Sequence, residues 1–393
     1  MAAPIDITVR PTAVEPLRRG HPWLYREQVA KVFGSPPVGA EARILAPDRT
    51  PLGRALVAVD EPIAARLFTH DDTPIDALLF AKRIERALAL RTALFADGST
   101  NAYRLLHGEG DRLPGFVVDV YDHVAVLRTD GGAAAAAVPR FAEAFGAATN
   151  GRFKTFVHRI ATKGDAPKIE LLAGDAPPDE IVVREHGVPF VVDLAKGQKT
   201  GAFLDQRENR KRVGAIARGK RVLNLFSYAG GFSLHAALGG ATRVTSVDIA
   251  ARAHATAQKS FRAAGVDPSL HEFVGADAFA FLESAKKNGR SFDLVISDPP
   301  SFAPNERSVP RALAAYRSLH RACTAVLAKD GVLCASSCSS HVAMHDFTAT
   351  LDDAVTGTEL AIQDAYGPPA DHPTLPAWPE GRYLKFVVLV RQR

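Results

Sequence analysis

The distribution of apolar and polar positions divides the chain into three parts. Residues 1–72 hold short apolar runs, such as DITVR and ARILAP, that are separated by stretches rich in Pro and Gly. This pattern predicts a small barrel-like β module. Residues 73–178 combine helical periodicity over residues 76–95 with strand-like runs such as GFVVDVY, which predicts a small α+β middle domain. The stretch GDAPPDE at residues 174–180 is typical of a linker.

Strands alternate with helices in the third part, residues 179–393. The apolar runs RVLNLF, RVTSVD, HEFVG, FDLVISD and GVLCASS are separated by segments with helical periodicity. This alternation predicts an α/β fold with a doubly wound, mostly parallel, Rossmann-like sheet. Ligands bind such sheets beyond the carboxyl ends of the strands. Residues that directly follow the strands are therefore the candidates for a functional site.

Composition adds few constraints. The chain of 393 residues has three cysteines, too few for a disulfide framework, and its N-terminal stretch lacks the pattern of a signal peptide. We therefore expect a reducing, intracellular setting. No apolar run approaches the length of a membrane span, so we expect no membrane partner. The net charge of +5 permits a polyanionic partner without requiring one. We expect no metal site, and the oligomeric state stays open, with a homodimer among the alternatives.

A glycine-bearing turn follows the run RVLNLF. The turn, Tyr228 to Gly231, comes directly before a helical pattern, and the next strand ends in Asp248, whose carboxylate can accept hydrogen bonds from ribose hydroxyls. The GxGxxG fingerprint that cradles a pyrophosphate is absent. A nucleoside cofactor without phosphates, such as S-adenosylmethionine, fits better. The structural alternative is that the glycines only allow a tight turn, and this stretch alone favours neither interpretation.

The next two strand ends favour the cofactor. Asp277 follows the run HEFVG, where a carboxylate can meet the amino group of adenine. Asp298, Pro299 and Pro300 follow FDLVISD, and two consecutive prolines cannot extend a central strand. They hold the chain rigid at the sheet edge, where a flat base can be positioned. An Asp-Pro-Pro motif followed closely by an aromatic residue, here Phe302, recurs in enzymes that methylate nucleobases.

The combined motifs resemble those of the bacterial large-subunit (23S) rRNA 5-methylcytosine methyltransferases that carry an N-terminal PUA domain. The resemblance rests on GQKTGAFLDQRENR, NLFSYAGGFSLHA, SVD, DPPSF, SSCSSH and DHPTLPAWPEGRYLK, and GHPWLY suits the PUA module, so it covers essentially the full length. It implies a class I methyltransferase fold with S-adenosylmethionine as methyl donor. It also implies a cytoplasmic enzyme whose RNA partner is 23S rRNA or a ribosome assembly intermediate.

The resemblance also assigns site residues. Six residues are expected to line the cofactor pocket: Phe226, Tyr228, Gly230, Asp248, Asp277 and Asp298. Five residues of the preceding segment are expected to close it: Lys199, Thr200, Phe203, Asp205 and Arg207. Pro299, Pro300 and Phe302 are expected to contact the target base, and Cys338 is expected to be the nucleophile.

A cysteine suits methylation at carbon 5 of cytosine, because addition of a thiolate to carbon 6 makes carbon 5 enamine-like. Cys338 follows the strand GVLCASS and falls at the carboxyl edge near DPPSF, whereas Cys334 lies within the strand and Cys323 within a helix at core-like spacing. We therefore favour Cys338 as the catalytic cysteine over a structural role. Asp298 can hydrogen-bond ring nitrogen 3 of the cytosine and stabilise charge there. Its structural alternative is a cap that anchors the loop.

The base that removes the carbon 5 proton stays open. Many RNA 5-methylcytosine enzymes carry a second cysteine after the proline of this motif, and the loop DPPSFAP has none. The proton must go to some other base or to water, and His341, His372 and Asp371 are candidate bases that the sequence does not rank.

Basic segments suggest RNA contacts. For residues 207–221, rich in Arg and Lys, the favoured interpretation is a solvated helical face and the alternative is phosphate contact. The first domain adds basic and aromatic groups that could grip RNA, although a tryptophan is more often a core residue. These groups are Arg18, Arg19, His21, Trp23 and Tyr25.

Three rival functions remain. Enzymes that methylate a ring or exocyclic nitrogen of a purine share the DPPSF motif and need no cysteine, so SSCSSH is the feature that separates them from our prediction. A non-catalytic RNA-binding protein with a degenerate methyltransferase domain is disfavoured by the intact Asp248, Asp277 and DPPSF. A small-molecule methyltransferase is disfavoured by the additional N-terminal domains.

Overall fold

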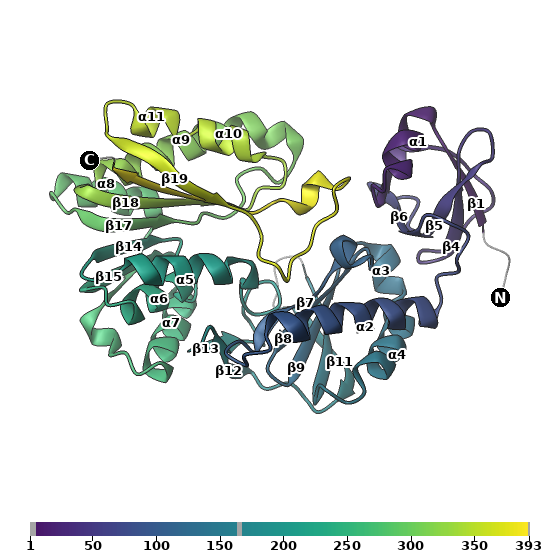
Figure 1. Cartoon of the computed structure of the whole chain (residues 1–393), viewed down its shortest axis with the longest axis horizontal. Helices are drawn as coiled ribbons and strands as arrows, with labels where there is room; N and C mark the ends of the chain where they lie inside the picture. The colour runs from purple at the N-terminus through teal and green to yellow at the C-terminus, as the bar shows by residue number, and fades with distance from the viewer. Residues whose placement is uncertain (1–4, 163–166, 392–393) are drawn as a thin grey trace. The chain divides into compact units, whose positions relative to one another are not determined.

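The computed structural model describes residues 5–162 and 167–391 and divides the chain into two compact units (Figure 1). Unit 1 comprises Met1–Asp179, Leu194–Gly201 and Ala370–Gly381. Unit 2 comprises Glu180–Asp193, Ala202–Pro369 and Arg382–Arg393. The predicted domain ranges also include residues 1–4, 163–166 and 392–393, which lie outside the described residues.

Unit 1 contains two sheets. The first has six strands in the order β2-β6-β5-β4-β1-β3, and helix α1 (Pro11–Arg18) packs on its apolar core. Its strands are β1 (Ile5–Val9), β2 (Trp23–Tyr25), β3 (Val29–Val32), β4 (Glu41–Leu45), β5 (Pro51–Val57) and β6 (Ile63–Thr69). The second has five strands in the order β11-β10-β9-β8-β7. Its strands are β7 (Ala102–His107), β8 (Phe116–Tyr121), β9 (Val124–Thr129), β10 (Thr155–Ile160) and β11 (Lys168–Gly174).

A capping carboxylate and a proline mark the starts of two helices that accompany the second sheet. Helix α2 (Ala77–Leu94) starts after Asp76, whose carboxylate accepts a hydrogen bond from the amide of Leu79 at 2.8 Å. The Ala-rich segment forms two helices, α3 (Gly132–Ala136) and α4 (Val138–Thr149). Pro139 lies in the first turn of α4, the position where its missing N–H costs no helical hydrogen bond.

Unit 2 is built on a seven-stranded sheet in the order β16-β15-β14-β17-β18-β20-β19. Five strands are parallel: β14 (Arg221–Leu225), β15 (Arg243–Asp248), β16 (Glu272–Gly275), β17 (Phe292–Ser297) and β18 (Leu327–Ser337). The predicted α/β class with a doubly wound, mostly parallel sheet is confirmed. Two antiparallel strands that the sequence pattern did not predict complete it, β19 (Leu360–Tyr366) and β20 (Lys385–Arg391).

Helices cover both faces of this sheet, as Figure 1 shows. Leu223 of β14 packs with helices α8 (Ala278–Lys287) and α9 (Val309–Ala325). Its neighbour Val222 packs on the opposite face with α5 (Arg207–Ile216) and α6 (Gly231–Leu238). Successive residues of a strand point to opposite faces. This alternation explains why β14 is apolar throughout, and it leaves only the strand ends open to chemistry.

A buried charge cluster joins α5 and α6 to the hairpin of β12 (Glu180–Glu185) and β13 (Val188–Asp193). The Glu185 carboxylate accepts two hydrogen bonds from Arg210, both at 2.5 Å, and one from His235 at 2.7 Å. Burial alone raises the pKa of Glu185, but the charge of Arg210 and these hydrogen bonds hold it well below its ordinary value. The carboxylate therefore stays ionised inside the protein.

The basic segment 207–221 is consequently not a solvated helical face throughout. Arg207 and Arg210 are 2% and 7% exposed, and both are ion-paired inside the fold, so the prediction is wrong for these two residues. Phosphate contact is excluded for Arg210 on the same ground, because its guanidinium is committed to Glu185. The sequence pattern missed this because Glu185 lies 25 positions earlier in the chain.

Substitution of Arg210 by Met should destabilise the protein by ~3–5 kcal/mol, because it leaves the Glu185 carboxylate buried without its strongest partner. Urea denaturation measures this loss. The matched control is Arg221→Met, which removes a half-exposed arginine from a surface pair with Asp293 and should cost at most about 1 kcal/mol. Equal losses for the two variants would contradict the assignment of Arg210 as a structural cation.

Candidate active site at the carboxyl edge of the sheet

The strand order of unit 2 defines where a ligand binds. From β14 the chain proceeds to β15 and β16 on one side, and β17 and β18 lie on the other side of β14. In open α/β sheets the crevice beyond the carboxyl ends of two such strands is the usual ligand site. Here those strands end next to Phe226 and Asp298, two of the predicted site residues.

The loop after β14 is conformationally strained. Phe226, Tyr228 and Gly230 have φ angles of 56°, 44° and 75°, and bulky residues rarely adopt the left-handed region. The surroundings hold the loop in place, because the amide of Ser227 donates to Val247 O at 3.0 Å and the amide of Tyr228 donates to an Asp248 oxygen at 2.8 Å. Strain fixed in this way is typical of a ligand-binding loop.

The Asp248 carboxylate organises this loop and keeps acceptor capacity. Its Oδ2 accepts from Tyr228, and its Oδ1 accepts from the amide of Ala250 at 2.9 Å. An ionised carboxylate offers about four acceptor positions, so two positions remain for the hydroxyls of a ribose. Ile249, immediately after Asp248, is 78% exposed and offers apolar surface to a ring. Ile249 was not among the predicted site residues, although an apolar residue directly after a strand-end carboxylate is visible in the sequence.

The two glycines of the turn have packing reasons of their own. A Cβ on Gly230 would lie 2.7 Å from the Cβ of Ala257, and a Cβ on Gly231 would lie 2.7 Å from the Cδ of Arg210. Both residues are needed for close packing against helix α7 (Ala251–Ala263) and the buried arginine. Close packing is thus a structural reason for both glycines, in addition to the tight turn and the cofactor contact that the sequence suggested.

Asp277 caps helix α8 at the end of β16. Its Oδ1 accepts hydrogen bonds from the amides of Phe279 at 2.9 Å and Ala280 at 3.0 Å. Asp277 is exposed, and neither of these bonds uses its Oδ2. Capping and recognition of an adenine amino group are thus compatible roles for one carboxylate.

A chain of amides orients Asp298. The guanidinium of Arg212 can only donate, and it donates to Asn209 Oδ1 at 3.2 Å. Asn209 Nδ2 therefore donates to Gln206 Oε1 at 2.6 Å, which leaves Gln206 Nε2 as a donor. That nitrogen donates to Asp298 Oδ1 at 3.0 Å and to Ser336 Oγ at 2.9 Å. Gln206 is 3% exposed and was not among the predicted residues, because two of its partners, Asp298 and Ser336, come from distant segments.

The loops after β17 and β18 are joined to each other. Cys338 Sγ lies 4.0 Å from the carbonyl oxygen of Pro299. The buried hydroxyl of Ser339 lies 3.1 Å from Ser301 Oγ and 3.4 Å from the amide nitrogen of Ala303. The structure therefore places the predicted nucleophile beside the Asp-Pro-Pro turn.

The three cysteines differ in burial. Cys323 and Cys334 are fully buried, and burial raises the pKa of each thiol to about 12, so both are inert. Cys338 is half-buried.

Of the residues predicted to contact the target base, Pro299 is buried and Pro300 is exposed. The half-buried ring of Phe302 packs 4.9 Å from that of Tyr316.

The segment that was predicted to close the pocket divides between the two units. In unit 2, the rings of Phe203 and Tyr228 meet edge to face at 5.2 Å, and Asp205 accepts a hydrogen bond from Tyr383 at 2.7 Å. Arg207, also in unit 2, is buried beside Glu208. Lys199 and Thr200 belong to unit 1.

Within unit 1, Thr200 and two of the candidate proton acceptors are engaged in a buried polar network. The Thr200 hydroxyl donates to Asp119 at 2.5 Å. Asp371 accepts from the amide of Arg104 at 2.9 Å, and its other oxygen lies 3.1 Å from His372 Nδ1. His341, the third candidate acceptor, is exposed in unit 2.

The predicted RNA-contacting groups of the first domain differ in exposure. Arg18 and Arg19 are exposed. Trp23 and Tyr25 are half-buried, and they donate hydrogen bonds to Glu109 at 2.7 Å and to Glu380 at 3.1 Å. His21 is also half-buried, and its ring lies beside the same two aromatic rings, with centroid distances of 6.0 and 6.1 Å.

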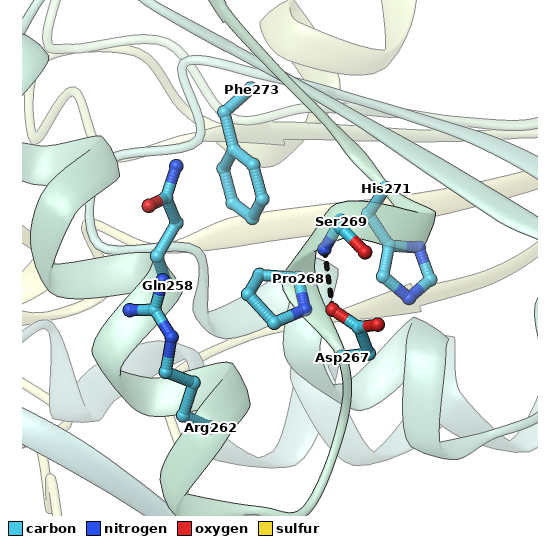
Figure 2. Close-up of a pocket in the computed structure, with 7 residues that line it drawn as sticks. All are labelled: Gln258, Arg262, Asp267, Pro268, Ser269, His271 and Phe273. Atoms are coloured by element: carbon cyan, nitrogen blue, oxygen red, sulfur yellow. Dashed lines mark hydrogen bonds between the residues drawn. The ribbon is translucent and has the colours of Figure 1, made fainter.

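A hollow of about 440 Å³ lies elsewhere in unit 2, as Figure 2 shows. It is formed where α7 ends and β16 begins, which is the amino end of the sheet. Seven residues line it: Gln258, Arg262, Asp267, Pro268, Ser269, His271 and Phe273. Asp267 is engaged by the amide of Ser269 at 2.9 Å, and no cysteine is among the seven. The hollow is therefore separate from the site at the carboxyl edge.

The strained loop, the strand-end carboxylates and the Asp-Pro-Pro turn on a doubly wound sheet define a Rossmann-like methyltransferase domain. The family model described as S-adenosylmethionine-dependent methyltransferase matches residues 135–373, and a model of a PUA-like domain matches residues 7–70. The chain belongs to the S-adenosylmethionine-dependent methyltransferase family, and S-adenosylmethionine is its cofactor. In the part of the chain that the structure describes, no helix is long and apolar enough to cross a membrane.

Relatives and solved structures agree with this family. The chain is 37% identical to a protein of Deinococcus radiodurans named "Ribosomal RNA large subunit methyltransferase", over 95% of this chain and 94% of that one. It is 34% identical to "Ribosomal RNA large subunit methyltransferase I" of Shewanella denitrificans, over 98% of each. A methyltransferase structure complexed with SAH, SMU.776, matches with a TM-score of 0.88 and 26% identity, over 98% of this chain and 100% of that one.

Replacing Asp248 by Asn should weaken S-adenosylmethionine binding by about 10- to 100-fold, because a charged acceptor is lost and the Tyr228 loop loses its anchor. Isothermal titration calorimetry with the full chain measures the affinity. Asp267→Asn, which changes a carboxylate at the amino end of the same sheet, should bind as the unchanged protein does. An Asp248→Asn variant with unaltered affinity would contradict the assignment, and no heat from the unchanged protein would indicate a degenerate domain.

Proposed function

We propose that this methyltransferase forms 5-methylcytosine in large-subunit rRNA through a covalent bond between Cys338 and the target cytosine. The observation that carries the proposal is the position of the Cys338 sulfur, 4.0 Å from Pro299 O, between the ends of β17 and β18. A nucleophile is needed there only if carbon 5 of a pyrimidine is the acceptor, since a purine nitrogen has its own lone pair. The names of the relatives support rRNA of the large subunit as the substrate.

The reaction at the cytosine follows from the chemistry of the thiolate. The Cys338 thiolate forms a bond to carbon 6 and pushes electron density to carbon 5, which becomes nucleophilic. S-adenosylmethionine, when bound, supplies an electrophilic methyl group. Carbon 5 then carries both a proton and the methyl group, and loss of the proton restores the double bond as the carbon–sulfur bond breaks. The proton passes to water or to a base, for which His341, Asp371 and His372 are the candidates.

Asp298 is proposed to act on the same ring. Gln206 holds its carboxyl group through Oδ1, so the orientation of the group is set before a substrate arrives. A carboxylic acid in this position can donate to ring nitrogen 3 and stabilise the charge that develops as the thiolate adds. Pro299, Pro300 and Phe302 are proposed to position the flat base.

The cofactor is proposed to lie across the ends of β14, β15 and β16. Asp248 would hold the ribose hydroxyls, Ile249 would contact the adenine ring, and Asp277 would accept from the adenine amino group through Oδ2. Phe226, Tyr228 and Gly230 would form the floor, with Phe203, Asp205 and Arg207 nearby. Lys199 and Thr200, from the segment that precedes Phe203, complete the set of residues proposed to bind the cofactor.

The RNA partner is proposed to be 23S rRNA or an assembly intermediate of the ribosome. The PUA-like domain at residues 7–70 is proposed to bind this RNA, with the exposed Arg18 and Arg19 contacting phosphate and Arg19 exchanging its surface pair with Glu15 for that contact. Ribosomal RNA as the substrate places the enzyme in the cytoplasm. A homodimer remains one of the alternatives for its oligomeric state.

Replacing Cys338 by Ala should lower the rate of cytosine methylation by at least about 1000-fold, because the covalent route is lost. Transfer of a labelled methyl group to large-subunit rRNA, followed by nucleoside analysis, measures it. Cys334→Ala is the matched control, since Cys334 lies in β18, the strand that Cys338 follows, and is buried in the core, so this variant should retain activity. Full methyl transfer by Cys338→Ala would support methylation of a purine nitrogen at the DPPSF motif.

The target can be identified in cells. Bisulfite sequencing of rRNA from cells that lack the gene should show the loss of one protected cytosine in the large subunit, restored by the intact gene and not by Cys338→Ala. RNA that carries 5-fluorocytosine at that position should form a stable adduct with the protein, because fluorine cannot leave as the proton does. An unchanged bisulfite pattern would contradict cytosine methylation of this rRNA.

A further inference from the structure

Lys385 is a buried cation next to the loop that carries Cys338. It is 1% exposed, begins β20 and pairs with Ser337, the last residue of β18. Its ammonium donates to the carbonyl oxygens of Ser339 at 2.6 Å and Val342 at 2.7 Å. Both carbonyls belong to the loop that directly follows Cys338, so Lys385 anchors this loop to the sheet.

The ammonium of Lys385 has neutral partners only. Within residues 5–162 and 167–391, its hydrogen bonds go to the two carbonyl oxygens, and no carboxylate forms an ion pair with it. A buried charge without an opposite charge is costly. Burial lowers the pKa of Lys385 to about 8, and the neighbouring Cys338 acts in the opposite direction. A negative charge on the Cys338 sulfur would therefore complete an ion pair.

The interaction is reciprocal. If a thiolate on Cys338 stabilises the protonated form of Lys385, the protonated Lys385 stabilises the thiolate by the same free energy. When the thiol ionises, its proton passes to solvent while Lys385 keeps its own. Below about pH 8 the ammonium remains largely protonated, so the stabilising charge is present at neutral pH.

Two other groups near Cys338, Tyr316 and Asp298, carry no positive charge. Tyr316 of α9 is buried, which raises its pKa, and it stays neutral while its hydroxyl lies 2.9 Å from Ser337 Oγ and 3.0 Å from Ser339 Oγ. Asp298, after β17, is an acid whose carboxylate would oppose a second negative charge.

The remaining titratable groups are outside the core. His341 is exposed in the loop itself. On helix α10 (Met344–Ala349), which packs against β20, the exposed His345 and the half-exposed Asp346 lie 3.3 Å from each other. Among these described groups, Lys385 is the buried cation.

We propose that Lys385 is the positioning residue for Cys338: its ammonium anchors the 339–342 loop and stabilises the thiolate from which the nucleophile reacts. The proposal rests on the proposed role of Cys338 as nucleophile. It adds a residue from the C-terminal antiparallel strand to a site otherwise built from parallel strand ends.

The test measures the ionisation of the Cys338 thiol in the full chain, in the absence of RNA and methyl donor. Cys338 is alkylated with iodoacetamide across a range of pH, and peptide mass spectrometry follows its modification. Lys385→Met removes the charge at similar length, Lys385→Gln keeps a neutral donor, and Lys385→Arg keeps the charge. The midpoint of alkylation should move to higher pH by about one pH unit or more in the Met and Gln variants and stay near its original value in the Arg variant.

A purely structural role for Lys385 predicts a different result. Loosening of the loop changes how fast the ionised thiol is alkylated, but it leaves the pH midpoint where it was. An unchanged midpoint in both Lys385→Met and Lys385→Gln would therefore overturn the proposal. It would leave the proposed function intact, since that is tested separately by methyl transfer in Cys338→Ala.

A second measurement applies if the Lys385 variants do not fold. In protein labelled at its lysine side chains, NMR follows the titration of Lys385 in the unchanged chain and in Cys338→Ser, a substitution in a half-exposed loop. By reciprocity, the ammonium should lose its proton at lower pH in Cys338→Ser, whose hydroxyl does not ionise. The same titration in both proteins would overturn the proposal.

Discussion

The parallel pairing of β17 with β18 is the constraint on which the proposed site depends. In this register Ile296 lies opposite Cys334 and Ser297 opposite Ala335. Because the strands run in the same direction, the segments that follow them emerge at one edge of the sheet. The Asp-Pro-Pro turn and Cys338 therefore become neighbours although 39 positions separate Pro299 from Cys338. The hydroxyl of Ser339 then joins the two loops.

Buried polar groups hold this edge in one conformation. The amide chain from Arg212 to Asp298 has a fixed direction because a guanidinium can only donate. The Glu185–Arg210 pair fixes helix α5, from which this chain begins, against the hairpin. A buried polar network destabilises the protein when some of its groups lack hydrogen-bond partners, and it is rigid when all of them are hydrogen-bonded. A site that must hold a carboxyl group and a thiol in place benefits from this rigidity.

The polypeptide departs from ordinary backbone geometry where it is predicted to meet its cofactor. Phe226 and Tyr228 adopt positive φ angles directly after β14, and the Asp248 carboxylate stabilises that loop from the next strand. The same carboxylate is the proposed acceptor for the ribose. One side chain would thus shape the loop and bind the ligand, so its substitution affects both functions together.

The sequence by itself determined the alternation of strands and helices, the fold class, the S-adenosylmethionine cofactor and the positions of the chemical motifs at strand ends. These features are local. Apolar periodicity, turns marked by proline and glycine, and short motifs can be recognised without knowledge of long-range contacts. The assignments of the individual site residues stay predictions. Only the tertiary structure decided that Arg210 is a buried structural cation and that Gln206 orients Asp298. It also decided that Lys385 donates hydrogen bonds to the loop that follows Cys338. Each of these findings depends on a partner from a distant segment, because burial and pairing are properties of the packed chain. The sequence around a charged residue does not show which distant residue will pair with it.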